Sequence, residues 1–144
     1  MEKQERIYGD YFKIIQNVIN RMARTSFLIK AWEITLIATI IVLTINFANV
    51  LVFGTLIGIT LIFWVLDSYY LWLEKAYRCL YDSKVEAYND ETNRETIVLF
   101  DMDYTQFRNL VKKVPKLMMS RSEGLFYIPI LIALINFTIF SFII

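Results

Sequence analysis

Two long stretches of the 144-residue chain contain no Asp, Glu, Lys or Arg. The first runs for 33 residues from Ile34 to Leu66, and the second covers the 21 residues from Gly124 to Ile144. A helix needs about 20 mainly apolar residues to cross the hydrocarbon core of a bilayer, so both stretches are long enough. Apolar residues make up 57% of the chain, more than a soluble domain usually carries. The sequence therefore predicts an all-α integral membrane protein.

The first stretch is too long for a single crossing. As one straight helix its 33 residues would extend about 50 Å, at about 1.5 Å per residue, which exceeds the hydrocarbon thickness. Asn46 and Asn49 lie near its middle, and their amides are better placed at an interface than in lipid. We therefore expect a transmembrane helical hairpin over residues 28–70, with arms over about 28–47 and 49–70.

The positions of the basic residues indicate which side of the membrane each segment occupies. Of the fifteen Lys and Arg residues, six precede the first charge-free stretch and nine lie between it and the second. Cytoplasmic flanks are enriched in Lys and Arg, and a hairpin keeps all fifteen on that side. We expect three transmembrane helices in the inner membrane, the last over 124–144, with the amino terminus cytoplasmic and the carboxyl terminus outside. A re-entrant or interfacial last helix is the alternative.

The segments outside the spans are expected to be cytoplasmic and helical. In residues 1–27, apolar side chains recur every three or four positions from Ile7 to Met22, which predicts an amphipathic helix. This helix either lies on the bilayer or packs against another helix. Residues 71–123 are expected to form a helical stalk and linker, because the second arm continues past residue 70 to about Tyr88 without Gly or Pro.

Beyond this stalk the apolar residues occur in shorter segments. The apolar run at 97–100 is either a strand or a buried segment, since periodicity does not separate the two for so short a run. A helix is expected over 104–114. Asp101 or Asp103 would cap its start, and Pro115 would set its end.

Small and polar residues within the hairpin suggest helix contacts. Gly54 and Gly58 are four apart, a spacing that lets another helix backbone approach closely, either within the hairpin or between copies of the chain. Thr35, Thr39 and Asn46 share a stripe on the first arm. This stripe either lines an aqueous pore or is satisfied locally, because Thr hydroxyls often bond to the backbone of their own helix.

Three ionisable residues are expected at the inner edge of the membrane. Folding the hairpin about residues 47 and 48 brings Lys30 and Asp67 within one turn of each other, with Glu33 one turn deeper. Ionisable residues near lipid are costly and usually paired. The simplest interpretation is ion pairing that holds the inner end of the hairpin, and the alternative is a gating or ion-selective role.

The stalk is rich in aromatic residues and is a candidate interaction surface. The expected contact residues are Tyr70, Leu73, Tyr77, Arg78 and Tyr81. Aromatic and basic side chains of this kind can stack on nucleotides, but Trp and Tyr also gather at bilayer interfaces. The simplest interpretation is an aromatic belt together with packing of the stalk, and the alternative is a contact surface for a cytoplasmic protein partner; we expect no nucleic acid or nucleotide.

The sequence does not favour an enzyme. It has no His and only one Cys, so it lacks the usual ligands of zinc and the usual side chain for acid–base catalysis. No phosphate-binding Gly loop or nucleophile with a base is recognisable. We expect no catalytic residue, no metal and no cofactor.

Two stretches resemble a pattern found in small bacterial inner-membrane proteins. They are RMARTSFLIKAWEITL, residues 21–36, and FWVLDSYYLWLEKAYRCLYD, residues 63–82. The resemblance implies no ligand or catalytic residue. The small size and few spans are also similar in layout to the membrane effectors of bacterial antiviral defence, which oligomerise and compromise the inner membrane.

Together these features lead to two hypotheses about function. In the first, the chain is a homo-oligomeric inner-membrane protein that forms a pore or disrupts the bilayer, and the similarity in layout suggests a role in antiviral defence. Three spans are too few to enclose a conduit, so several copies would be required. In the second, it is a non-conducting membrane scaffold whose stalk recruits a soluble cytoplasmic partner.

Overall fold

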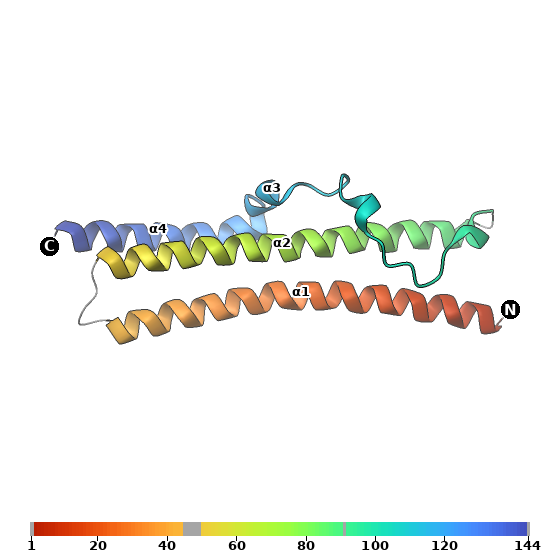
Figure 1. The fold of residues 1–144 in the computed structure, drawn as a ribbon, viewed down its shortest axis with the longest axis horizontal. Coiled ribbons are helices and arrows are strands. Elements are labelled where there is room, and N and C mark those ends of the chain that lie inside the picture. The colour runs from red at the N-terminus through yellow and green to blue at the C-terminus, as the bar shows by residue number, and fades with distance from the viewer. Residues whose placement is uncertain (1, 45–49, 91, 144) are drawn as a thin grey trace. The chain divides into compact units, whose positions relative to one another are not determined.

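The fold is entirely helical over the described residues. The computed structural model describes residues 2–44, 50–90 and 92–143, and no strand occurs in these ranges. The all-α prediction is confirmed. In chain order (Figure 1) the elements are α1 Glu2–Thr44, α2 Val50–Asn89, the short 3₁₀ turns η1 Arg94–Thr96 and η2 Thr105–Phe107, α3 Val114–Met118 and α4 Arg121–Ile143.

Three of these helices are long and apolar enough to cross a membrane. They are the stretches Gln4–Thr44 in α1, Val50–Asn89 in α2 and Arg121–Ser141 in α4. The predicted number of candidate spans is therefore confirmed, on length and composition. Insertion into a membrane and the sidedness of the termini stay predictions.

The chain forms two compact units, and α1 and α2 contribute to both. Unit 1 consists of residues 1–24 and 70–112, and unit 2 of residues 25–69 and 113–144. The boundaries between the units at residues 24/25 and 69/70 lie within three residues of the expected hairpin limits, 28 and 70. The boundary at 112/113 lies well before residue 124, where the last span was expected to begin.

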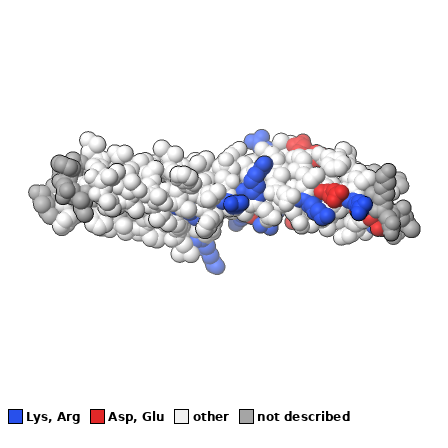
Figure 2. Space-filling model, turned by 90° about the horizontal axis from the view of Figure 1, so that it is seen from below, with Lys and Arg blue, Asp and Glu red and all other residues white. Residues whose placement is uncertain are grey.

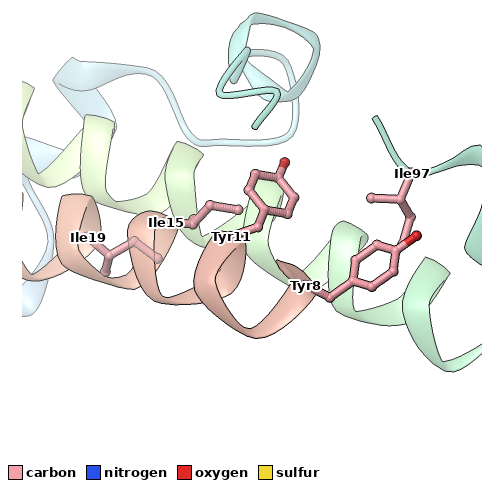
Figure 3. Close-up of a cluster of buried hydrophobic side chains, with 5 residues drawn as sticks. All are labelled: Tyr8, Tyr11, Ile15, Ile19 and Ile97. Carbon is pink, nitrogen blue, oxygen red and sulfur yellow. The ribbon is translucent and has the colours of Figure 1, made fainter. Parts of the chain in front are cut away.

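Unit 1 is held together by a core between the start of α1 and the chain that follows α2. Tyr8, Tyr11, Ile15 and Ile19 project from one face of α1 and are buried together with Ile97 (Figure 3). The hydroxyl of Tyr11 donates a hydrogen bond of 2.6 Å to the backbone carbonyl of Asp101. The amphipathic start of the chain thus packs against protein within this unit, as one of the two alternatives expected. The partly buried residues around this core are Phe12, Tyr77, Tyr81, Ala87, Tyr88, Leu99 and Met102.

The segment 97–100 is irregular, so it is not a strand. Ile97 is 8% exposed and joins the core of unit 1, whereas Val98 is 65% exposed. Phe100 has a φ of 63°, in the left-handed region that only some residues tolerate, and its ring meets that of Tyr11 edge-on. The chain reverses direction locally here, which an extended strand would prevent.

The helix expected over 104–114 is wrong. Asp103 does accept the backbone N–H of Thr105, as a cap would, but only one 3₁₀ turn follows. Leu110 is 72% exposed whereas Val111 is buried, so these two residues do not lie on a common buried face as the expected helix would require. An isolated helix of this length is marginal without a packing surface along its whole face, and the non-helical path places Val111 inside.

Unit 1 is expected to lose stability in acid through Asp101. The pKa of its carboxyl is lowered, first by the backbone N–H of Asp103 and then by the Lys84 ammonium, 3.1 Å away. Because the folded-state pKa lies below the ordinary value, the stabilisation is present above the ordinary Asp pKa. It disappears as the pH falls through the lowered pKa. Chemical unfolding of the full chain, followed from neutral to acid pH, should show this loss.

The Asp101→Asn variant provides the comparison for this pH dependence. Its stability should fall less steeply in the acid range, because Asn does not titrate. The pKa values of Asp90 and Asp103 are also lowered by neighbouring hydrogen bonds, so part of the acid dependence should persist. Identical acid profiles for the variant and the wild type would contradict the role of Asp101.

Unit 2 contains the most apolar parts of α1, α2 and α4. Phe53, Leu56 and Leu134 form its small buried core, and the rings of Phe53 and Phe137 stack at 5.6 Å. α4 begins at Arg121, three residues before the expected span, so Glu123 lies inside the helix. Pro129 lies inside α4, and α3 occupies part of the expected linker.

Candidate functional site: a buried charged cluster

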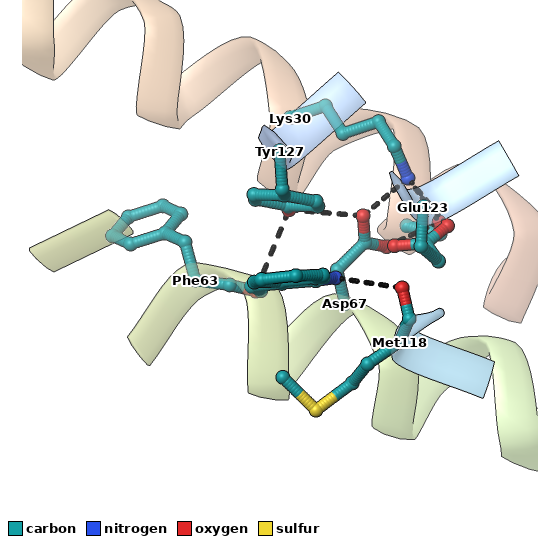
Figure 4. A network of polar contacts seen from close by, with 8 residues as sticks. Lys30, Phe63, Asp67, Met118, Glu123 and Tyr127 are labelled. Carbon is teal, nitrogen blue, oxygen red and sulfur yellow. Dashed lines mark hydrogen bonds and ion pairs between the residues drawn. The ribbon is translucent and has the colours of Figure 1, made fainter. Parts of the chain in front are cut away.

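Unit 2 brings ionisable and other polar side chains from three helices into one buried cluster. On each helix they are spaced by three or four residues, so they share a face. α1 contributes Ser26, Lys30 and Glu33; α2 contributes Thr60, Trp64 and Asp67; and α4 contributes Glu123 and Tyr127. Figure 4 shows Lys30, Asp67, Glu123 and Tyr127 converging.

Asp67 is the centre of the cluster. Its side chain is fully buried and accepts hydrogen bonds from three donors. Ser26 donates to one carboxylate oxygen, and the Lys30 ammonium and the Tyr127 hydroxyl both donate to the other, the latter at 3.0 Å. Both oxygens of this buried side chain therefore have hydrogen-bond partners within unit 2.

Lys30 joins two of the carboxylates. Its ammonium also donates to one oxygen of Glu123 at 3.0 Å, and its side chain is 18% exposed. The second oxygen of Glu123 is buried and has no hydrogen-bond partner in the described part of the chain. One cation thus bridges α1 to both α2 and α4, which makes it the electrostatic link among the three helices.

Glu33 is buried without a comparable partner. Its exposed fraction is 0%, and neither carboxyl oxygen makes a hydrogen bond that meets normal geometry among the described residues. The hydroxyl of Thr60, beside it on α2, is buried and equally unpaired. A buried polar group without a partner costs about 1–3 kcal/mol, and a charged one more. A functional role is one of the recognised explanations for such a group.

Aromatic rings close one side of the cluster. The indole of Trp64 stacks on the phenol ring of Tyr127 with 5.6 Å between centroids and 12° between planes. The indole N–H donates to the backbone carbonyl of Met118, 3.2 Å away, and so ties α2 to the end of α3 (Figure 4). This packing fixes the orientation of Tyr127, whose hydroxyl then meets Asp67.

The cluster contains three carboxyl groups and one amine. If all were ionised it would carry two net negative charges, counting Glu33, Asp67 and Glu123 against Lys30. Ionisable residues inside membrane helices are costly, face the interior of the bundle and commonly mark an ion pathway. Its excess of acid therefore suits a cation or a proton and opposes an anion.

The structure brings together only part of the predicted membrane-edge set. Lys30 and Asp67 form an ion pair, whereas Glu33 lies outside the hydrogen-bonded network. Glu123 and Tyr127 complete the network and were not anticipated. A signal for Glu123 was present: it directly precedes the last charge-free stretch, at the same expected edge as Lys30 and Asp67.

Among the predicted packing and pore-lining residues that the structure describes, Gly54, Gly58, Thr35 and Thr39 face away from the other helices of this chain. A Cβ added at Gly54 or Gly58 would meet nothing within 4 Å, so neither glycine packs within the hairpin. Contact between copies stays a prediction. Thr35 and Thr39 are exposed, and their hydroxyls bond to carbonyls of α1 at 2.9 and 2.7 Å. Asn46 lies outside the described residues.

The predicted stalk surface is largely used inside unit 1. The ring of Tyr77 contacts that of Tyr104 at 5.0 Å, and the Tyr81 hydroxyl accepts a hydrogen bond from Gln16. Arg78 is exposed and pairs with Glu74 one turn away. Tyr70 and Leu73 are half-buried. Recruitment of a cytoplasmic partner through this face stays a prediction, and it would compete with these contacts.

The cluster does not have the composition of a metal site. Over residues 2–44, 50–90 and 92–143, no three His, Cys, Asp or Glu side chains converge as potential ligands. Its carboxyl groups are instead dispersed around Lys30. Comparison of the chain with protein-family models, with curated proteins and with solved structures finds no match.

Proposed function

We propose that the chain is an inner-membrane protein that assembles into an oligomer and lets cations cross the bilayer. The observation that supports this most is the buried cluster, with its excess of carboxyl groups, inside a unit of three apolar helices. A purely structural ion pair would need one carboxylate for Lys30. Additional buried acids lower stability, and membrane helices retain such groups mainly along ion or proton pathways.

Several copies are required for a continuous path. Three helices pack side by side around side chains, and the interior of unit 2 is filled by Leu56, Trp64 and Tyr127. Gly54 and Gly58 present a surface without side chains on the outside of α2, where a helix of another copy can approach closely. Thr35 and Thr39 lie on the outer surface of α1 and would be available to such an assembly.

The outer surface of unit 2 suits lipid or further copies of the chain. Figure 2 shows Lys, Arg, Asp and Glu gathered over one part of the face drawn, next to a long part without them. Large apolar side chains are exposed on all three long helices of this unit, for example Leu43, Leu51 and Leu125 at 74–77%. A host cell whose membrane is depolarised by such a protein would stop growing, which is the outcome expected of an antiviral effector.

Blocking the exposed glycine face should abolish permeation. The Gly54→Leu/Gly58→Leu variant is expected to prevent close helix approach between copies and to eliminate the leak of cations, potassium or protons, across proteoliposome membranes. Ala133→Leu is the matched control, because it enlarges another exposed small residue on α4. We expect the control to leak like the wild type and to have the same oligomer mass in mild detergent. A monomeric wild type, or equal leak in all three proteins, would contradict the proposal.

A further inference from the structure

We propose that Glu33 carries an exchangeable proton within unit 2, and that the proton is the ion this cluster takes. The second half of the proposal rests on the proposed function, because only a permeating protein conducts an ion. The first half is independent of conduction. It follows from how the donors and acceptors of the cluster are distributed.

The charged and phenolic donors of the cluster are directed away from Glu33. Lys30 donates to Asp67 and to Glu123, and its third hydrogen bond is a long one to Ser26 at 3.4 Å. The Tyr127 hydroxyl has a single proton, which the 3.0 Å contact directs to Asp67. The Thr60 hydroxyl is the neutral donor beside Glu33, and it makes no hydrogen bond of normal geometry with Glu33 in the described part of the chain.

An ionised carboxylate at Glu33 would therefore be buried and uncompensated. Removing such an ion from water costs several kcal/mol even after the protein relaxes, and the usual response is to bind a proton. The charged groups facing it have opposite effects: Lys30 on α1 favours ionisation, whereas Asp67 on α2 opposes it. Lys30 is already compensated by Asp67 and Glu123. Glu33 is consequently a neutral acid that can release and regain a proton.

The position of Glu33 suits a group that carries a proton rather than one that only holds the helices together. It lies three residues beyond Lys30 in the direction of Thr44, hence one turn farther along the apolar part of α1. On α4, Glu123 and Tyr127 are the titratable groups of the cluster, and one oxygen of Glu123 is free to accept a proton. Proton transfer from Glu33 would break its O–H bond and form a new one on an acceptor, leaving the Glu33 carboxylate.

The protonated state is tested by infrared spectroscopy on the full chain in lipid. A neutral carboxylic acid has a carbonyl-stretch band that ionised carboxylates lack, and the band shifts in heavy water. We expect this band at neutral pH and its loss in Glu33→Gln. Glu74→Gln is the control, because Glu74 forms an ion pair with Arg78 outside the cluster, so its removal should leave the band unchanged. A Glu33→Gln spectrum identical to the wild type would overturn the proposal.

The identity of the ion is tested by flux into proteoliposomes that contain a pH-sensitive dye. We expect proton flux in the wild type and in Glu74→Gln, retention of flux in Glu33→Asp, and complete loss in Glu33→Gln. Potassium flux that equals proton flux and is insensitive to Glu33→Gln would overturn the proton as the ion while leaving permeation standing. No flux of either ion would overturn the proposed function, and the infrared band would still decide whether Glu33 holds a proton.

Discussion

Replacing Lys30 with Met is expected to lower the free energy of unfolding by about 3–5 kcal/mol, the usual cost of removing one partner from a buried ion pair. The change leaves Asp67 and Glu123 without their shared cation inside unit 2. Met has a similar length and fits an apolar surrounding, so the loss reports charge and not a cavity. Unfolding of the full chain in mild detergent, followed by Trp fluorescence, measures it.

A matched control and a rescue variant separate charge from packing. Lys75→Met removes an exposed cation from α2 and is expected to change stability by less than about 0.5 kcal/mol. The triple variant Lys30→Met/Asp67→Asn/Glu123→Gln removes both uncompensated carboxylates and should recover most of the loss. If Lys30→Met were as stable as Lys75→Met, the bridging role of Lys30 would be wrong.

Truncation of Tyr11 should have an effect of similar size in unit 1. Tyr11 is fully buried, and deletion of a buried aromatic side chain costs about 3–5 kcal/mol through lost transfer energy and the cavity that remains. Tyr11→Ala also removes the hydrogen bond to the Asp101 carbonyl and the contacts with the rings of Phe12 and Phe100. Denaturant unfolding of the full chain should show the loss.

Two further variants divide this loss into its parts. Tyr11→Phe keeps the ring and removes the hydroxyl, so it should cost only about 0.5–1.5 kcal/mol, the net value of one hydrogen bond. Ile14→Ala, at a residue of the same helix that is 41% exposed, should cost clearly less than Tyr11→Ala. Equal losses for Tyr11→Ala and Ile14→Ala would show that the Tyr11 core does not hold unit 1 together.

The site was only partly accessible from the sequence. The pairing of Lys30 with Asp67 follows from hairpin geometry, because residues equidistant from a helical turn meet across it. The participation of Glu123 required knowing that α4 begins at Arg121 and packs beside α2. The missing partner of Glu33 required knowing where every nearby donor points, which no spacing rule contains.

The sequence by itself determined the all-helical class and the three long apolar helices, because a charge-free run of the length of a bilayer crossing has few other ways to satisfy its backbone. It also determined that α2 continues without a break to Asn89. Only the tertiary structure decided which faces are used. Residues 104–114 form one 3₁₀ turn in place of the expected helix, and Val111 is buried. Gly54 and Gly58 face away from the other helices of the chain. The reason is physical: periodicity reports which side chains share a face, whereas burial depends on what lies opposite that face in space.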